Sequence, residues 1–119
     1  MSREQINPWE IKTLHDVTNE GLLENLISDM IENGWHGRPL LVIETEDNYF
    51  AWTGTHRVHA AREAGFESIP CYVLDESVLK KHGFDAVHDH VLDYERVKIL
   101  RKVGDETALS LMVDEGRVF

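Results

Sequence analysis

The segment WTGTHRVHAAREAG, residues 52–65, places two basic side chains where a helix is expected to begin. Its alanine-rich part is typical of a helix that ends at Gly65. His56 and Arg57 therefore fall in the first turn, and Glu63, the only acid, falls in the last turn. A helix dipole favours the opposite order, and each misplaced charge costs about 0.3–1 kcal/mol. This order indicates that the start of the helix binds a negatively charged group.

The residues just before this helix have the chemistry of an anion site. Gly54 allows a close approach to the backbone, and the first N–H groups of a helix have no partners within the helix. Thr53 or Thr55 can cap the helix or donate a hydrogen bond. The segment therefore suits an anion, and phosphate above all. In the alternative interpretation, Arg57 pairs with a nearby carboxylate and His56 only packs against its neighbours.

A second group of candidates lies in the segment NGWHGRPLL, residues 33–41. Trp35 could stack on a base, and Arg38 could contact phosphate. In the alternative, Trp35 closes the edge of the core and Arg38 is solvated. Glu32, at the end of the preceding predicted helix, is a spare candidate acid.

The histidines and the single cysteine predict neither a metal site nor thiol chemistry. His88 and His90 would point about 200° apart on a helix, so they cannot bind one ion together, and His82 adds no ligand spacing typical of zinc sites. Cys71 lies inside an apolar strand, which predicts a small buried hydrophobic residue. A single cysteine excludes an intramolecular disulfide, so a cytoplasmic location is expected.

The chain is acidic, with 12 Lys and Arg residues against 22 Asp and Glu residues and a formal net charge of −10 over 119 residues. Because nucleic-acid binding needs a basic face, we expect the isolated chain not to bind duplex DNA. No apolar run approaches the length of a membrane-spanning helix, so no membrane partner is expected. An apolar stripe favours core packing or self-association, which keeps a homodimer or a protein partner open. The stripe comprises Phe84, Val87, Val91 and Tyr94.

The elements that position these residues alternate in type. The patterns predict a helix over 19–33, a strand buried on both faces over 39–44, a hairpin into 49–52 and a strand over 68–75. The segment REQINP predicts a short edge strand that Pro8 ends. From Glu76 onwards the chain is expected to be helical, with breaks at Gly83, Gly104 and Gly116. We therefore predict one α/β domain over 1–119, with a small mixed sheet and a helical C-terminal third over 76–119.

Taken in order, these elements resemble the ParB/sulfiredoxin superfamily. The resemblance covers about residues 3–75 and rests on RPLLVIETEDNYFAWTGTHRVHAAREAGFESIPCYVLD together with the preceding helix GLLENLISDMIENG. The corresponding loop reads Gly-Glu-Arg-Arg in ParB-type proteins and Gly-Cys-His-Arg in sulfiredoxins. The resemblance implies a nucleotide-binding fold in which this loop holds phosphates. On that basis, the phosphate contacts are Gly54, Thr55, His56 and Arg57, and the helix residues Asn25 and Asp29 face the nucleotide.

Departures from each branch of the family narrow the expected function. Thr55 stands where sulfiredoxins have their cysteine, and because a hydroxyl cannot replace a thiolate, sulfiredoxin activity is not expected. The last 36 residues are short and acidic, which disfavours the helix-turn-helix region of full-length ParB proteins and favours a stand-alone ParB-like module. Archaeal free-serine kinases on this fold have a His-acid pair that resembles His15-Asp16, so Asp16 could act as a general base or hold Mg²⁺. Their loop has Asp before the glycine, whereas this chain has Thr53, which argues against transfer chemistry.

The sequence therefore predicts a protein that binds the phosphates of a nucleoside triphosphate, ATP or CTP, with Mg²⁺ as a candidate cofactor. If the protein is an enzyme, it hydrolyses the nucleotide or transfers a phosphoryl group, with Asp16 or Glu32 as the acid. One alternative is a non-catalytic module in which a nucleotide or a partner protein gates an interaction. The other alternative is a ParB-like DNA-binding or nuclease protein.

Overall fold

The computed structural model describes residues 2–35, 37–88, 91–115 and 117–118. Its strands are β1 (Ser2–Ile6), β2 (Ile11–Thr13), β3 (Leu40–Glu44), β4 (Tyr49–Ala51), β5 (Ile69–Asp75), β6 (Val91–Leu92) and β7 (Arg117–Val118). Its α-helices are α1 (Glu20–Asn33), α2 (Thr55–Glu63), α3 (Glu76–Lys81), α4 (Tyr94–Val103) and α5 (Glu106–Glu115), and a 3-10 helix, η1, spans Pro8–Glu10.

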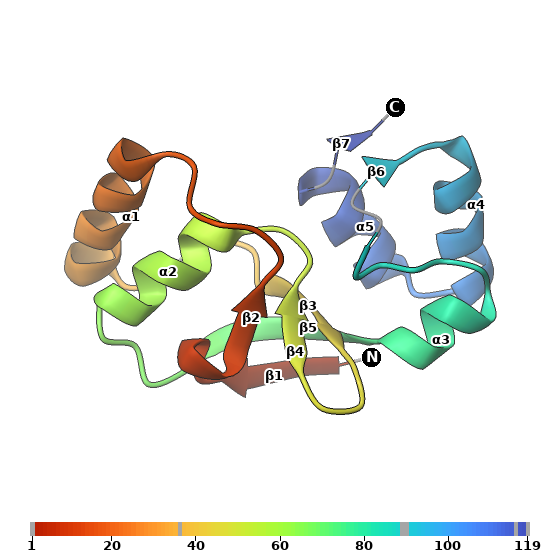
Figure 1. Ribbon diagram of the computed structural model, residues 1–119, viewed down its shortest axis with the longest axis horizontal. Coiled ribbons are helices and arrows are strands. Elements are labelled where there is room, and N and C mark those ends of the chain that lie inside the picture. Colours follow the sequence, from red (N-terminus) through yellow and green to blue (C-terminus); the bar gives the residue numbers. More distant parts are fainter. Residues whose placement is uncertain (1, 36, 89–90, 116, 119) are drawn as a thin grey trace.

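One mixed sheet contains the first five strands, in the order β1-β5-β3-β4-β2 (Figure 1). β5 is antiparallel to β1 and parallel to β3, whereas β4 is antiparallel to β3 and parallel to β2. β3 is therefore central, and its residues 40–43 have no exposed surface. The predicted strands over 39–44 and 68–75, the hairpin into 49–52 and the N-terminal edge strand are confirmed.

The sequence patterns do not predict β2, which is three residues long and pairs with β4 at the second edge of the sheet. Tertiary contacts hold it in place. Arg62 of α2 donates hydrogen bonds to the carbonyl oxygens of Pro8 at 3.0 Å and of Ile11 at 2.5 Å. The same guanidinium lies over the Trp9 ring, 5.2 Å from its centroid. A single arginine thus fixes η1 and β2 against α2.

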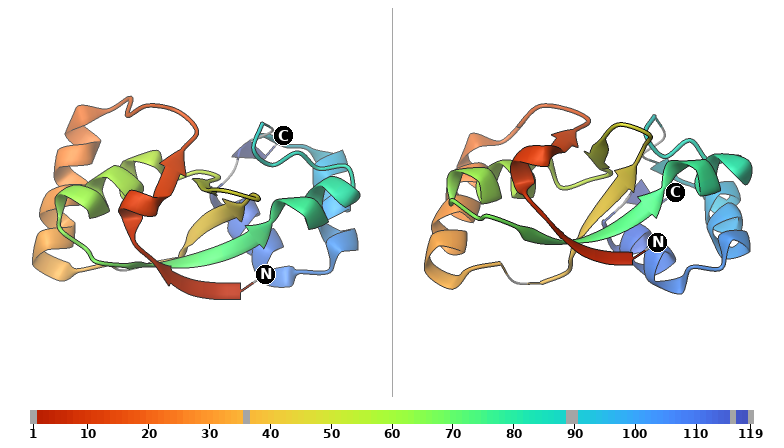
Figure 2. Two further views of the ribbon diagram at one scale, coloured as in Figure 1. Left: turned by 60° about the horizontal axis from the view of Figure 1, so that its bottom comes forward. Right: turned by 90° about the horizontal axis from the view of Figure 1, so that it is seen from below.

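Helices cover both faces of the sheet, so the fold has three layers (Figures 1 and 2). Side chains alternate along β3, which sends Leu40 and Val42 to one face and Leu41 and Ile43 to the other. On the first face these residues form a core with α1 and α2. On the second face they form a core with α3, α4 and α5. The described C-terminal third therefore supplies the cover for one face of the sheet.

Helix α1 confirms the prediction over 19–33. The Asn19 side chain caps it by accepting from the Leu22 N–H at 2.9 Å, and the chain leaves it at Gly34 with φ +73°. The apolar stripe is narrower than the spacing indicates. Leu22 is 44% exposed and Ile31 is 65% exposed, so the packed face consists of Leu23, Leu26, Ile27 and Met30.

The prediction of a continuous helix through residues 84–94 is wrong. Gly83 has φ +90° and ends α3, the chain then turns through Asp85–His88, and Val91–Leu92 form β6. Asp93 starts a new helix because its side chain accepts from the Arg96 N–H at 2.9 Å. Of the predicted stripe, Phe84 is buried but Tyr94 is 68% exposed, so the four residues do not form one helical face. The expected breaks at Gly83 and Gly104 are confirmed, whereas His90 and Gly116 lie outside the described residues.

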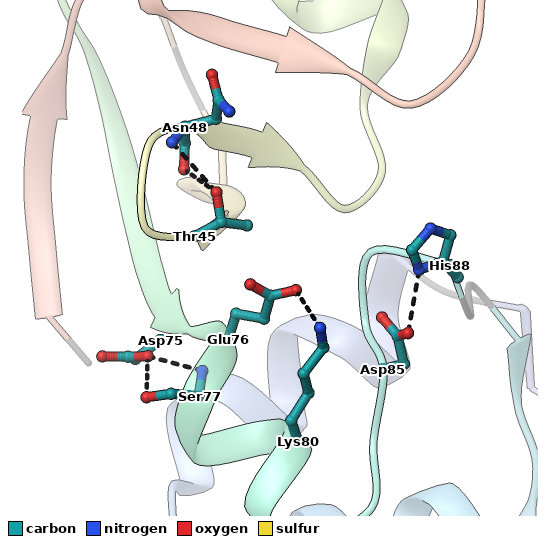
Figure 3. A network of polar contacts seen from close by, with 8 residues as sticks. All are labelled: Thr45, Asn48, Asp75, Glu76, Ser77, Lys80, Asp85 and His88. Atoms are coloured by element: carbon teal, nitrogen blue, oxygen red, sulfur yellow. Dashed lines mark hydrogen bonds and ion pairs between the residues drawn. The ribbon is translucent and has the colours of Figure 1, made fainter.

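Short polar networks fix the turns at the end of the sheet where β3 meets β4 and β5 meets α3 (Figure 3). Thr45 and Asn48 bond each other across the hairpin, and Asp75 accepts from the backbone N–H and hydroxyl of Ser77. Beyond them, Lys80 pairs with Glu76 at 3.0 Å, and Nδ1 of His88 lies 3.0 Å from Asp85. His88 therefore has a carboxylate partner within its own turn.

Candidate functional site

The left-handed conformation of Gly54 joins the sheet to the start of α2. Its φ is +87° and its ψ is +31°, a region that L-residues with side chains rarely adopt. A Cβ atom here would lie 2.8 Å from Cδ1 of Leu40 in the central strand. Leu40 therefore occupies the space that a side chain at this position would need. Gly54 is therefore required by the packing of α2 against β3.

The N-terminal end of α2 differs from that of the other α-helices in the described part of the chain. Those helices are capped by the side chains of Asn19, Asp75, Asp93 and Asp105. Each also has an acid in its first turn. α2 has no side-chain cap and no acid in its first turn, where His56 and Arg57 stand instead. The first turn of α2 therefore combines the partial positive charge of the helix dipole with two basic side chains.

Thr55 faces inward from this end of the helix. It is 3% exposed, and its Oγ1 lies 3.3 Å from Nδ1 of His15. The same ring nitrogen lies 3.3 Å from the carbonyl oxygen of Asp16. A carbonyl only accepts, so Nδ1 carries the proton in this arrangement. The loop before α1 is thereby tied to the first residue of α2.

His56 connects the starts of two helices. Its Nε2 accepts a hydrogen bond from the backbone N–H of Asn19 at 3.1 Å. This bond requires Nε2 to be unprotonated, so the neutral ring carries its proton on Nδ1. The side chain thus has a defined hydrogen-bonding role in place of simple packing.

Arg57 reaches toward the loop that follows α1. Its guanidinium lies over the Trp35 ring, 4.4 Å from the centroid, and donates a hydrogen bond to the carbonyl oxygen of Arg38. The structure therefore brings Arg57, at the start of α2, into contact with Trp35 and Arg38 of the loop after α1, and all three are predicted binding residues. The Trp35 indole Nε1 is buried and has no hydrogen-bond partner within the described residues.

His59 belongs to the same cluster, although the sequence analysis does not identify it. It follows Thr55 by four residues and His56 by three, which places the three side chains on one side of the helix. Burial lowers the pKa of His59, and electrostatic interactions with Arg62 and His56 lower it further. The negative charge of Asp16 raises this pKa. The spacing from Thr55 and His56 is the signal that could have identified it.

The predicted residues of α1 are spread along the helix. Asn25 is exposed, and Asp29 is partly buried and accepts from the Asn33 side chain at 2.8 Å. The two candidate acids are both exposed, with Asp16 before the helix and Glu32 in its last turn. A helix of 14 residues is about 20 Å long, so the structure does not bring these two acids together.

Thiol and metal chemistry have little support in this structure. Cys71 is fully buried, its Sγ donates to the Ile69 carbonyl at 3.5 Å, and burial raises its pKa to about 12. Within the described ranges, no three His, Cys, Asp or Glu side chains are grouped so that they could hold a metal ion. In the same ranges, no helix is long and apolar enough to cross a membrane.

Two cavities of about 350 Å³ each lie beside the β3–β4 hairpin. Glu44 and Glu46 line both of them, and no residue of 54–57 does. An acidic lining repels phosphate, so these cavities do not offer an alternative site for the ligand that the sequence predicts.

Comparisons with known proteins identify the family and the fold. The model of the ParB N-terminal domain family matches residues 2–84. Sulfiredoxin from Arabidopsis thaliana has a similar structure, with a TM-score of 0.55 and 20% identity over 69% of this chain and 97% of that chain. No curated protein matches the sequence.

Two structures of a chromosome-partitioning protein cover more of this chain. C-terminally truncated ParB from Caulobacter crescentus complexed with CTP-γ-S has a TM-score of 0.54 and 18% identity over 98% of this chain and 73% of that chain. The same truncated protein complexed to the centromeric parS site has a TM-score of 0.52 and 18% identity over 96% of this chain and 65% of that chain. At these identities the solved structures show a shared fold.

Proposed function

This chain belongs to the ParB N-terminal domain family, and we propose that it binds a nucleoside triphosphate with the phosphates at the start of α2. The observation that supports this most strongly is the open N-terminal end of α2, which has neither a side-chain cap nor an acid in its first turn. A phosphate placed there accepts from the backbone N–H groups and complements the helix dipole. The proposed contacts are Gly54, Thr55, His56 and Arg57.

The side chains of the loop prepare this end of the helix for a ligand. Thr55 and His56 are held by His15 and Asn19, so the backbone of the first turn is fixed before a ligand arrives. Arg57 supplies the formal positive charge. One face of the Trp35 ring is covered by Arg57, so a base that stacks on Trp35 must use the other face.

The relative complexed with CTP-γ-S supports a nucleotide as the class of ligand. Asn25 and Asp29 of α1 are the proposed contacts on the nucleotide side, and Arg38 is a proposed second positive group. We expect CTP and ATP to compete for one site. The ratio of their affinities for the protein shows which base the site prefers.

Asp16 is the better placed of the two acids for chemistry on the nucleotide. Its neighbour His15 contacts Thr55, and its own charge acts on His59. We therefore propose Asp16 as the acid that holds Mg²⁺ or activates a hydroxyl, if the protein hydrolyses nucleotide or transfers a phosphoryl group. Glu32 lies in the last turn of α1, about 20 Å along the helix from its first residue, so the two acids do not act on the same group. The second candidate function is a non-catalytic module in which a nucleotide or a partner protein gates an interaction.

Calorimetric titration with CTP, ATP, GTP and ADP, with and without Mg²⁺, tests the binding site. We expect Arg57→Ala to weaken binding by about 10- to 100-fold, because a charge-assisted hydrogen bond is lost. Arg101→Ala is the matched control, since Arg101 is exposed on α4 and away from the loop. Equal affinities for wild type and Arg57→Ala, or no binding of any nucleotide to the wild type, would overturn the proposal.

Phosphate release measured on the same samples separates the two candidate functions. In an enzyme, Asp16→Asn should abolish release while nucleotide affinity changes little. In a gating module, the wild type binds nucleotide without releasing phosphate, and Asp16→Asn has no effect on either readout. Glu32→Gln serves as the control for a general loss of surface charge.

A further inference from the structure

A cavity of about 630 Å³ lies between the start of β1, the loop at residues 37–39 and helix α5. Figure 2 shows this end of β1 beside α5, on the sheet face that is covered by the C-terminal helices. Arg38 links this cavity to the start of α2. It lines the cavity, and its carbonyl oxygen accepts a hydrogen bond from Arg57 of α2. The other lining residues belong to neither α1 nor α2.

The cavity is positively charged in a protein of net charge −10. Arg3 and Arg38 line it, and the only carboxylate in its lining is that of Glu106. Arg3 is exposed, and its side chain makes no hydrogen bond or ion pair with any residue in the described part of the chain. Two guanidinium groups on one concave surface attract anions more strongly than the surrounding acidic surface does.

The register of the sheet explains why an arginine faces this cavity. Arg3 lies opposite Tyr72, whose side chain belongs to the core under α5. Glu4 lies opposite Cys71, whose side chain belongs to the core under α1 and α2. Because neighbouring residues of a strand point to opposite faces, the β1 acid is directed away from α5 and the β1 arginine toward it.

Asp105, the residue before α5, is a partly buried acid that has hydrogen-bond partners within the fold. Asp105 accepts from the Tyr72 hydroxyl at 2.6 Å and from the Ala108 N–H at 3.0 Å. Each of its two carboxylate oxygens therefore accepts a hydrogen bond from a neighbouring residue, one from the Tyr72 phenol and one from the first turn of α5.

We propose that this cavity binds a small organic anion that has one negatively charged group and an apolar body. Arg3 binds the charged group, and the hydroxyl of Ser110 donates to its oxygens. Pro39 and Leu111 supply the apolar wall. The volume falls within the range of small-molecule sites, which is about 300–1,000 Å³.

Phenyl phosphate is a suitable probe, and amide chemical shifts in the full chain report where it binds. We expect shifts at Thr107, Ser110 and Gly37, and we expect benzyl alcohol, which has a similar ring without the charge, to produce none. Arg3→Ala should weaken phenyl phosphate binding about tenfold or more. Ser110→Trp should block binding by filling the cavity. Both substituted side chains are exposed, so both variants should fold.

The same titrations separate this site from the one at α2. Arg57→Ala should leave the shifts at Thr107 and Ser110 unchanged, and Arg3→Ala should leave the nucleotide affinity unchanged. Shifts confined to residues 54–57, or unchanged affinity in Arg3→Ala and Ser110→Trp, would overturn the second site without bearing on the first. Equal shifts with benzyl alcohol would overturn the assignment of an anion as the ligand.

Discussion

The backbone N–H of Asn19 donates to Nε2 of His56 at 3.1 Å, and this bond joins the first residues of α1 and α2. Asn19 is also the residue whose side chain caps α1. The start of α1 is therefore tied to the proposed phosphate site through His56.

Gly54→Ala should be more destabilising than Gly65→Ala. Both glycines have positive φ, +87° and +84°, so each substitution costs about 1–2 kcal/mol in backbone strain. The Cβ of an alanine at 54 would also lie 2.8 Å from Leu40, whereas at 65 it would meet nothing within 4 Å. Urea denaturation of both variants measures the difference. Equal losses would show that Leu40 moves aside without cost.

The stability of the protein should fall as the pH drops below about 6.5. Burial, Arg62 and His56 lower the pKa of His59 in the folded state, so the unfolded chain takes up this proton at a higher pH. The contribution of His59 is full above the unfolded pKa, about 6.5, and is lost as the pH falls through that value toward the folded pKa. Melting temperatures across this range measure the loss.

His59→Gln should flatten this pH dependence, because it removes the group whose pKa is lowered in the folded state. Asp75, Asp85 and Asp93 also have lowered pKa values. Their contributions to stability are lost only below about pH 3.8, so they do not affect this pH range. A slope that persists unchanged in His59→Gln would place its origin in another group.

Cys71→Ser should destabilise the fold by about 1–3 kcal/mol, because a hydroxyl would be buried in an apolar strand. Cys71→Ala is the control, since it removes the sulfur without adding a polar group. Nucleotide binding should stay unchanged in both variants. The folded wild type should also react slowly with thiol reagents, because its thiol is buried and its pKa is about 12. Loss of a catalytic activity with stability intact would show that the thiol takes part in chemistry.

The isolated chain should not bind duplex DNA at submicromolar concentration in about 150 mM salt. Its net charge of −10 opposes the counterion release that drives such binding. Gel-shift titration checks this, with and without CTP, since a relative has been solved both with CTP-γ-S and with parS. A retarded band in either condition would reveal a basic face that nucleotide or self-association creates.

Local patterns were enough to predict most of the sheet and the main helices. The continuous apolar run of residues 40–43 is buried on both faces because it forms the central strand, and Asn19 and Gly34 mark the ends of α1 as capping rules predict. The short strand β2 was not predictable, because three residues show no period and depend on Arg62, far along the chain, for their position. The helix expected across residues 84–94 failed for a related reason. Phe84 packs into the core between the sheet and the C-terminal helices, and Asp93 caps a new helix in place of continuing the old one.

For the candidate site, the sequence by itself determined the unusual charge order of α2 and the family resemblance, because these depend on neighbouring residues only. Only the tertiary structure decided what the side chains do. It placed His15 beside Thr55 and Arg57 over Trp35, and it filled the space beside Gly54 with Leu40. It also brought β1 beside α5 to form a cavity from residues about 100 positions apart. Such contacts depend on how distant elements pack, and no local pattern records that packing.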